Sequence, residues 1–311
     1  MGKIASAEYS ATRCVRNIIT NYELRITSFE RLLYSLVFFC AFCVFAGNSS
    51  AQNLESLSEQ IRFGTVEIKR TALSQIRNLE SAEASRIAIP ALTDAAEIVR
   101  ATAAFSVIFL PKEEAFSVLA PQLNDKSELV RRETAYALGK VQNPSVVSSL
   151  LQILQKDKIL EVRNAAVVAL GEIGDVSAID SLNKILQRKP TENDEFTRRS
   201  AARSIGQIAQ IIQIQKAQVI TPKNFLPEKY KEIILPEYAK LAAEFPAFRE
   251  SLPVLIQILQ NPKESDDTKR EAAFALGAIG DQSAISILQA NLNNQDYYLA
   301  EICKEALRKI N

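Results

Sequence analysis

An internal repeat with a period of about 31 residues constrains this chain more than any other feature, because such a period predicts stacked supersecondary units. The segments that begin at Val130, Val162 and Thr268 share a basic second residue and the triplet Ala-Leu-Gly seven positions after the start. Weaker copies bring the total to seven, and the starts are evenly spaced except for one long step. The copies begin at Ile68, Val99, Val130, Val162, Thr197, Thr268 and Leu299.

Each copy carries the pattern of one helix face. A small residue stands four positions after every start, and aliphatic residues stand eight and eleven positions after it. This spacing places the three positions on one side of an α-helix, where a small side chain lets a neighbouring helix approach closely. The small residues are Ala72, Ala103, Thr134, Ala166, Ala201, Ala272 and Cys303.

The sequence also marks the end of this helix and the start of a second one. Gly174 and Gly280 suit the left-handed conformation that ends a helix. Asp175 and Asp281 follow them and can cap the next helix. One helix pair cannot bury its apolar face alone, whereas stacked pairs can. We therefore predict an all-α solenoid of stacked antiparallel helical hairpins, with about six full repeats and a C-terminal half repeat.

The repeat motif resembles a known family. Read from Val162, the motif is V-R-x-x-A-x-x-A-L-G-x-I-G-D. It is similar to the HEAT repeats, specifically to the short HEAT-like repeats of the phycobilin-lyase type, over roughly residues 53–311. The resemblance implies the solenoid fold but no single function, because that family spans scaffolds, chaperone-like factors and a few lyases. It contributes no lyase-specific residue.

Composition argues against several function classes. Hydrophobic residues make up 47% of the chain, which is enough for a substantial core. The chain has no histidine, so it lacks the side chain best suited to proton transfer near neutral pH and the commonest metal ligand. We therefore expect no enzyme activity, no metal and no cofactor. The formal net charge of +1 argues against a broad nucleic-acid-binding surface.

The N-terminal region has the layout of a targeting segment. Residues 32–46 form an unbroken apolar run of fifteen, and Arg25 and Arg31 precede it. Small residues at Ser49 and Ala51 suit cleavage after position 51. A helix of fifteen residues spans roughly 22 Å, which is short of the ~30 Å hydrocarbon core of a membrane.

This layout predicts that residues 1–51 are a signal peptide or a membrane-targeting segment. The protein is then exported, to the periplasm or the cell envelope. One alternative is an uncleaved membrane anchor formed by residues 32–46. Another is a cytosolic protein in which this stretch forms a buried helix.

A periodic set of charged residues accompanies the repeats. A carboxylate falls five residues before three of the starts, and a guanidinium falls one residue after each of them. One interpretation is an anion-binding ladder. The other is structural: each Asp caps its helix while each Arg pairs with an Asp of an adjacent repeat. The period of the set equals that of the fold, which favours the structural interpretation. The ladder comprises Asp94, Arg100, Asp125, Arg131, Asp157 and Arg163, with Asp175 and Asp281 at hairpin turns.

The long step between the starts at Thr197 and Thr268 indicates an insertion inside the repeat that starts near residue 197. Alignment of the second-helix leucines places it at about residues 211–250. It carries aromatic residues with lysines nearby, a composition typical of interaction hot spots. Alternatively, the rings hold the insertion against the solenoid. The candidate partner-binding residues are Phe225, Lys229, Tyr230, Lys231, Tyr238, Phe245 and Phe248.

These features together predict an exported, non-enzymatic scaffold that binds a protein or peptide partner. The concave face of the solenoid would hold the partner, and the insertion would set specificity. A lyase or cofactor-handling subunit is an alternative that rests on the family resemblance alone. A structural envelope or assembly protein is another. The sequence leaves the oligomeric state open.

Overall fold

The computed structural model describes residues 53–216 and 241–310. The chain divides into two units, Met1–Ser56 and Leu57–Asn311, and the helices presented below belong to the second. The targeting segment expected at residues 1–51 lies outside the described residues. The regular elements of the described ranges are all helices, which confirms the all-α prediction.

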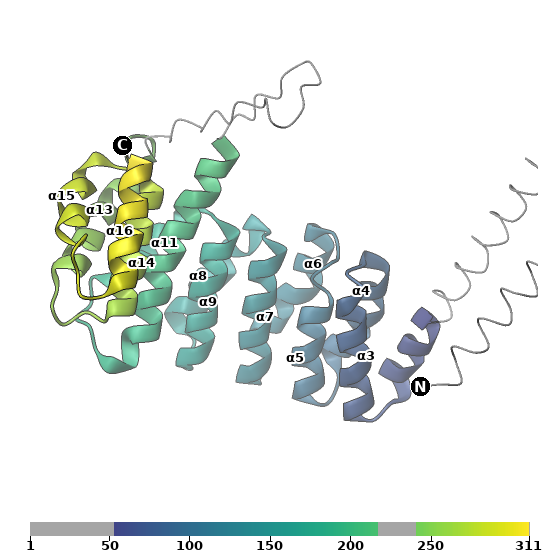
Figure 1. Cartoon of the computed structure of the whole chain (residues 1–311). Helices are drawn as coiled ribbons and strands as arrows, with labels where there is room; N and C mark the ends of the chain where they lie inside the picture. The colour runs from purple at the N-terminus through teal and green to yellow at the C-terminus, as the bar shows by residue number, and fades with distance from the viewer. Residues whose placement is uncertain (1–52, 217–240, 311) are drawn as a thin grey trace, which may run out of the picture. The chain divides into compact units, whose positions relative to one another are not determined.

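The first helix of each repeat contributes to one layer, the first-helix layer. Consecutive members of this layer pack against each other, and Figure 1 shows α3, α5, α7, α9 and α11 side by side in chain order. Contact continues from α11 to α14, although the insertion separates them in the sequence. The helices are α3 (Val66–Asn78), α5 (Glu97–Ser106), α7 (Glu128–Val141), α9 (Leu160–Ile173), α11 (Glu195–Lys216), α14 (Asp266–Ile279) and α16 (Tyr297–Ile310).

The second helices form the other layer, the second-helix layer. Each packs against the first helix of its own repeat or of the next repeat, as α8 does against α9 and α10 against α11. Short 3-10 turns extend several of them, with a proline near the start of η1 (Ile89–Thr93) and η2 (Ala120–Asn124). The helices are α4 (Ala82–Ala88), α6 (Lys112–Leu119), α8 (Val147–Lys156), α10 (Ile179–Leu186), α13 (Pro246–Gln260) and α15 (Ile285–Ala290).

Small residues allow the first-helix layer to pack closely. The residue four positions after each repeat start is fully buried in all seven copies, as the spacing predicts. Gly277 of α14 shows how tight this packing is, because a Cβ added there would lie 2.6 Å from the Cβ of Ala306 on α16. A larger side chain at this position would force the two helices apart.

The hairpin turns follow the sequence pattern. Gly174 and Gly280 adopt φ values of 81° and 75°, and their N–H groups donate to the carbonyls of Leu170 and Leu276. Left-handed backbone of this kind favours glycine. The next residue caps the following turn: the Asp175 carboxylate accepts from the N–H of Ser177 at 2.8 Å. Asp281 accepts from Ser283 in the same way at 2.9 Å.

Regular helices extend into both ends of the predicted insertion. Helix α11 continues to Lys216, and α13 begins at Pro246, directly after the short α12 (Leu241–Glu244). The candidate residues Phe225, Lys229, Tyr230, Lys231 and Tyr238 lie outside the described residues.

Phe248 belongs to the core and not to a binding surface. Its side chain on α13 is fully buried. The ring of Phe245 packs against it edge to face, with the ring centroids 6.1 Å apart and the planes at 83°. This corrects the partner-binding hypothesis for Phe248, because a ring without exposed surface cannot contact a partner. The edge-to-face pair joins the N-cap residue of α13 to its first turn, and the buried Phe248 ring anchors that end of the helix in the core.

Candidate functional site

The charged ladder connects each repeat to the next one. Arg100 donates from Nε and Nη2 to the two carboxylate oxygens of Asp125, at 2.7 and 2.9 Å. Arg131 reaches Asp157 in the same way, at 2.7 and 3.1 Å. Lys69 contacts Asp94 at 2.6 Å. In these repeats each basic side chain pairs with the Asp of the following repeat, as the structural interpretation of the ladder expects.

The aspartates of the ladder also cap the first helices. The carboxylates of Asp94, Asp125 and Asp157 each accept from the backbone N–H two residues later, at 2.8 to 2.9 Å. The remaining Nη1 group of each arginine donates to the backbone carbonyl of the Asp in its own repeat, so Arg131 contacts the carbonyl of Asp125 at 2.9 Å. Each ladder carboxylate therefore joins a helix start to the neighbouring repeat.

These contacts shift the pKa values of the aspartates downward. The hydrogen bond from Arg100 lowers the pKa of Asp125 below its ordinary value of 3.8, against the opposing effect of burial. Burial raises the pKa of Asp157, but the hydrogen bonds from Arg131 and from the Ile159 N–H outweigh it, so the net pKa is lowered. The ionised form is the one that the folded chain binds.

We therefore expect acid to destabilise the fold through these carboxylates. A pKa that is lower in the folded than in the unfolded state adds stability above the unfolded value of 3.8. That contribution is lost as the pH falls through the lower, folded pKa. Urea unfolding from pH 7 to pH 2.5 should show it as a decrease in the free energy of unfolding below about pH 5. In Asp125→Asn the decrease should be shallower, and equal pH dependence in the two proteins would contradict this role for Asp125.

The ladder has one gap, at Arg163. Its Nη1 group donates to the carbonyls of Asp157 and Lys158, at 2.8 and 3.2 Å, as the other ladder arginines do. No carboxylate of the described residues accepts from its Nε or Nη2. Of the arginines in the predicted ladder, Arg163 is therefore the one that lacks an acid from the next repeat.

The ladder resumes across the insertion. Arg198 donates from Nε and Nη2 to Glu264 at 2.9 and 2.6 Å, although 66 positions separate the two residues. Their side chains are only 3% and 2% exposed. Further along, Arg270 makes the same side-on contact with Asp296, at 2.7 and 3.0 Å.

A row of half-buried or exposed side chains runs along the first-helix layer. It consists of the residue six positions after each repeat start, and we call it the first-helix face. Three of its members are aromatic and half-buried, which places ring surface within reach of a partner. The sequence analysis missed this row, although the shared register of the rings was a signal that could have revealed it. The row comprises Ser74, Phe105, Tyr136, Val168, Arg203, Phe274 and Glu305.

A pocket of about 260 Å³ lies on this face between α11, α14 and α16. Phe274, Gly277, Ile302 and Ala306 supply apolar surface, and charged residues, among them Arg203 and Glu271, line the remainder. The ring of Phe274 lies over α11, where a Cβ added to Gly206 would lie 2.5 Å from its Cε1 atom. Apolar surface bordered by charges is the usual composition of a protein interface.

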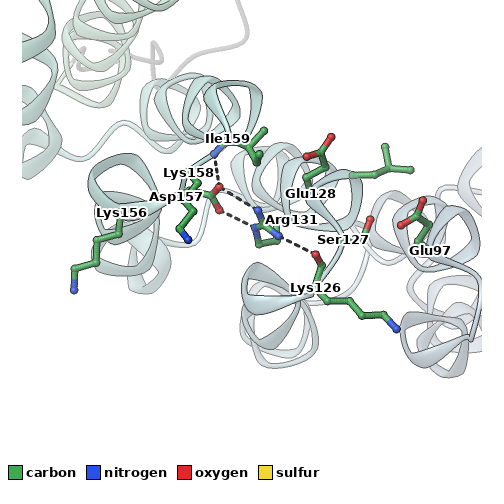
Figure 2. A pocket seen from close by; sticks show the side chains of 10 residues that line it. Glu97, Lys126, Ser127, Glu128, Arg131, Lys156, Asp157, Lys158 and Ile159 are labelled. Carbon is green, nitrogen blue, oxygen red and sulfur yellow. Dashed lines mark hydrogen bonds and ion pairs between the residues drawn. The ribbon is translucent and has the colours of Figure 1, made fainter.

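A second, more polar hollow of about 680 Å³ lies where the loops between hairpins line up. Figure 2 shows the Arg131–Asp157 pair inside it and the ammonium groups of Lys126 and Lys156 pointing away from that pair. Lys126, Lys156 and Lys158 are exposed. Two carboxylates at the starts of first helices, Glu97 and Glu128, also line this hollow.

Comparison with known proteins identifies the family. The sequence profile of HEAT repeats matches residues 85–167, 116–206 and 237–308, which together cover more than half of the chain. The chain belongs to the HEAT-repeat family. The profile skips residues 207–236, so it is interrupted within the repeat in which the sequence predicts an insertion.

Individual relatives of this HEAT-repeat protein are distant. The deoxyhypusine hydroxylase of Bos taurus is 34% identical over 62 residues, 20% of this chain and 20% of that protein. The chain thus matches about a fifth of the length of that curated relative.

Solved structures show the fold. An engineered protein superposes with a TM-score of 0.50 at 18% identity, over 83% of this chain and 68% of the other. The complex of CpcE and CpcF of phycocyanin lyase from Nostoc gives 0.43 at 18% identity, over 83% and 94% of the chains.

None of the helices in the described ranges is long and apolar enough to cross a membrane. Across those same ranges, no three cysteine or acidic side chains are grouped so that they could hold a metal ion.

Proposed function

We propose that this HEAT-repeat chain is a non-enzymatic scaffold that binds a protein or peptide partner along the first-helix face. The observation that carries the proposal is the row of half-exposed rings at one register, Phe105, Tyr136 and Phe274, which ends in an apolar pocket with charged neighbours. Aromatic side chains in such settings supply much of the binding energy of protein interfaces. The regular HEAT stack suits this role, because it presents equivalent positions repeatedly along one surface.

We further propose that the scaffold acts outside the cytoplasm. The apolar run at residues 32–46, with basic residues before it and small residues after it, supports export. Among the described residues, this compartment would expose no cysteine to oxidation, because Cys303 is buried and its pKa is raised to about 12.

Site-specific photo-crosslinking tests the binding face. A benzophenone amino acid is placed at Phe105, Tyr136 or Phe274 of the full chain, and the protein is illuminated in its native compartment. We expect one adduct of common mass from all three positions, because they lie in one row. Gln152, which is exposed on α8 in the second-helix layer, is the matched control and should give no such adduct. Equal crosslinking from Gln152, or no crosslinking from the three positions on the first-helix face, would contradict the proposal.

Truncation of the pocket ring tests its contribution to affinity. Phe274→Ala should lower recovery of the crosslinked partner roughly tenfold or more, since hot-spot side chains contribute more than about 1 kcal/mol and 1.4 kcal/mol is tenfold. The reporter position for this measurement is Tyr136. Unchanged recovery would remove the pocket from the interface, and the rest of the row would then carry the binding.

A further inference from the structure

At the gap in the ladder, Arg163 is held by backbone contacts and has no carboxylate partner among the described residues. Arg100, Arg131 and Arg270 each present Nε and Nη2 to a carboxylate of the next repeat. Arg163 is held by the same two backbone contacts as Arg131, so its guanidinium is fixed in the same way. Its side-on edge, which binds carboxylates elsewhere in the ladder, has no acceptor among the described residues.

Backbone contacts identify the residue that replaces the missing acid. In the intact ladder, the Asp carbonyl accepts from Nη1 of the arginine in its own repeat, as the Asp157 carbonyl does from Arg163 at 2.8 Å. In the next repeat the carbonyl of Arg188 accepts from Nη1 of Arg198 at 2.7 Å. Nη1 of Arg198 also donates to the carbonyls of Ile185 and Leu186, so Arg188 is the one of these three residues that lies beyond the end of α10, as Asp157 lies beyond the end of α8. This loop therefore offers a basic residue at the place closest to that of a ladder aspartate.

Exposed basic residues occur in the hairpin loops before α9 and directly after α10. Lys158, Arg188 and Lys189 are exposed, and Lys158 also lines the polar hollow in Figure 2. The nearest acid in the sequence, Glu161, is exposed at the first turn of α9 and does not pair with Arg163. A preorganised guanidinium among lysines binds a carboxylate through two parallel hydrogen bonds.

We propose that Arg163 binds a carboxylate from an acidic segment of the protein partner, which takes the place of the missing ladder aspartate. This inference rests on the proposed function and adds the class of partner. A protein segment fits better than a nucleic acid. Glu97 and Glu128 line the adjoining hollow and would repel a continuous polyanion, and the chain has a net charge of only +1. Separated carboxylates on a peptide can reach Arg163 and avoid those two residues.

The test uses the full chain and a synthetic probe. The probe is an end-blocked peptide of twelve residues in which Asp alternates with Ser, with a rhodamine label, and its matched control carries Asn in place of Asp. Fluorescence anisotropy should show at least tenfold tighter binding of the Asp peptide. Arg163→Gln should weaken that binding about tenfold, as loss of a charge-assisted bidentate contact does. Arg77→Gln, which removes an exposed cation from the last turn of α3, three repeats away, should leave it unchanged.

Two variants with the same charge change separate geometry from electrostatics. Arg188→Asp supplies the missing ladder acid from within the chain, so it should occupy Arg163, abolish peptide binding and raise the melting temperature by about 2–4 °C. Lys189→Asp changes the net charge equally at the neighbouring position and should retain most of the binding. Because the first variant is expected to be more stable, its loss of binding cannot come from unfolding.

Several outcomes would overturn the inference. The first is equal binding of the Asp and Asn peptides, and the second is wild-type affinity in Arg163→Gln. The third is an equal loss of affinity in Arg188→Asp and Lys189→Asp. The fourth is displacement of the labelled peptide by inorganic phosphate or oligouridylate at lower concentrations than by unlabelled peptide. Crosslinking from Phe274 distinguishes this failure from failure of the proposed function. If the adduct forms while the peptide does not bind, the proposal of a partner-binding scaffold is retained and the contact of Arg163 with an acidic segment is rejected.

Discussion

Replacing Glu264 with glutamine is expected to lower the free energy of unfolding by about 3–5 kcal/mol. Glu264 and Arg198 are among the most deeply buried charged residues described, with side chains 2% and 3% exposed. Two charge-assisted hydrogen bonds join them, at 2.9 and 2.6 Å. Glutamine keeps the shape of the side chain but leaves the Arg198 guanidinium buried without a counter-charge, which is the costly way to break such a pair.

Thermal and urea unfolding of the full chain measure this effect. The melting temperature should fall by about 6–20 °C, at roughly 2–4 °C for each kcal/mol in a domain of this size. Glu305→Gln is the matched control, because its partner Arg308 is 67% exposed and Glu305 is 54% exposed. Exposed pairs contribute about 0–1 kcal/mol. A loss in Glu264→Gln no larger than in the control would show that water reaches the Arg198 site.

Replacing both Arg198 and Glu264 with apolar residues separates the contribution of the ion pair from that of the other hydrogen bonds that Arg198 makes. Its Nη1 group also donates to the carbonyls of Ile185 and Leu186 at the end of α10, at 3.1 and 2.9 Å. Removing both charges avoids an unpaired buried ion, and such replacements are often neutral when the volumes match. Here the two carbonyls would lose their donor. We therefore expect Arg198→Met with Glu264→Leu to recover only part of the stability that Glu264→Gln loses.

Periodicity made most of the fold and half of the ladder predictable. Positions that recur at the period of the repeat sit in equivalent environments, so the small residues, the capping aspartates and the partners of Arg100 and Arg131 follow from the register. Equivalent positions can no longer be matched where the insertion interrupts the repeat. Glu264 could not be assigned to Arg198, because the insertion separates them and the spacing no longer defines which residues meet. Near the C-terminus the basic residue one position after the repeat start is Lys269, yet Arg270, two positions after that start, pairs with Asp296.

The binding surface was harder to predict than the fold, because an aromatic residue has the same signature in a core and in an interface. Phe248 lies among the aromatic residues of the predicted insertion and suggested a hot spot, yet α13 directs its ring into the core. In the sequence, Phe105, Tyr136 and Phe274 each look like an ordinary helix residue. Their common position six residues after a repeat start is visible in the sequence, but the packing of adjacent helices is needed to show that these rings remain half-buried in one row.

Replacing Phe248 with alanine is expected to cost about 3–5 kcal/mol of stability, because the substitution removes a fully buried ring and leaves a cavity. Phe245→Ala should cost less, since that ring is half-buried and loses mainly its edge-to-face contact. Urea unfolding of the full chain measures both. A loss below about 1 kcal/mol in Phe248→Ala would mean that α13 is not anchored through this ring.

Phe274→Ala is expected to affect mainly partner crosslinking, and Phe248→Ala mainly the stability of the fold. This contrast distinguishes a ring that binds a partner from a ring that packs in the core. Truncation of the half-buried Phe274 ring should cost less stability than Phe248→Ala and should reduce partner crosslinking from Tyr136. Phe248→Ala should lower the stability sharply and, at temperatures where it remains folded, should keep the crosslinking yield of the wild-type chain. If Phe248→Ala lost crosslinking while folded, then α13 and the segment before it would belong to the binding surface, and the insertion would again be the place to search for specificity.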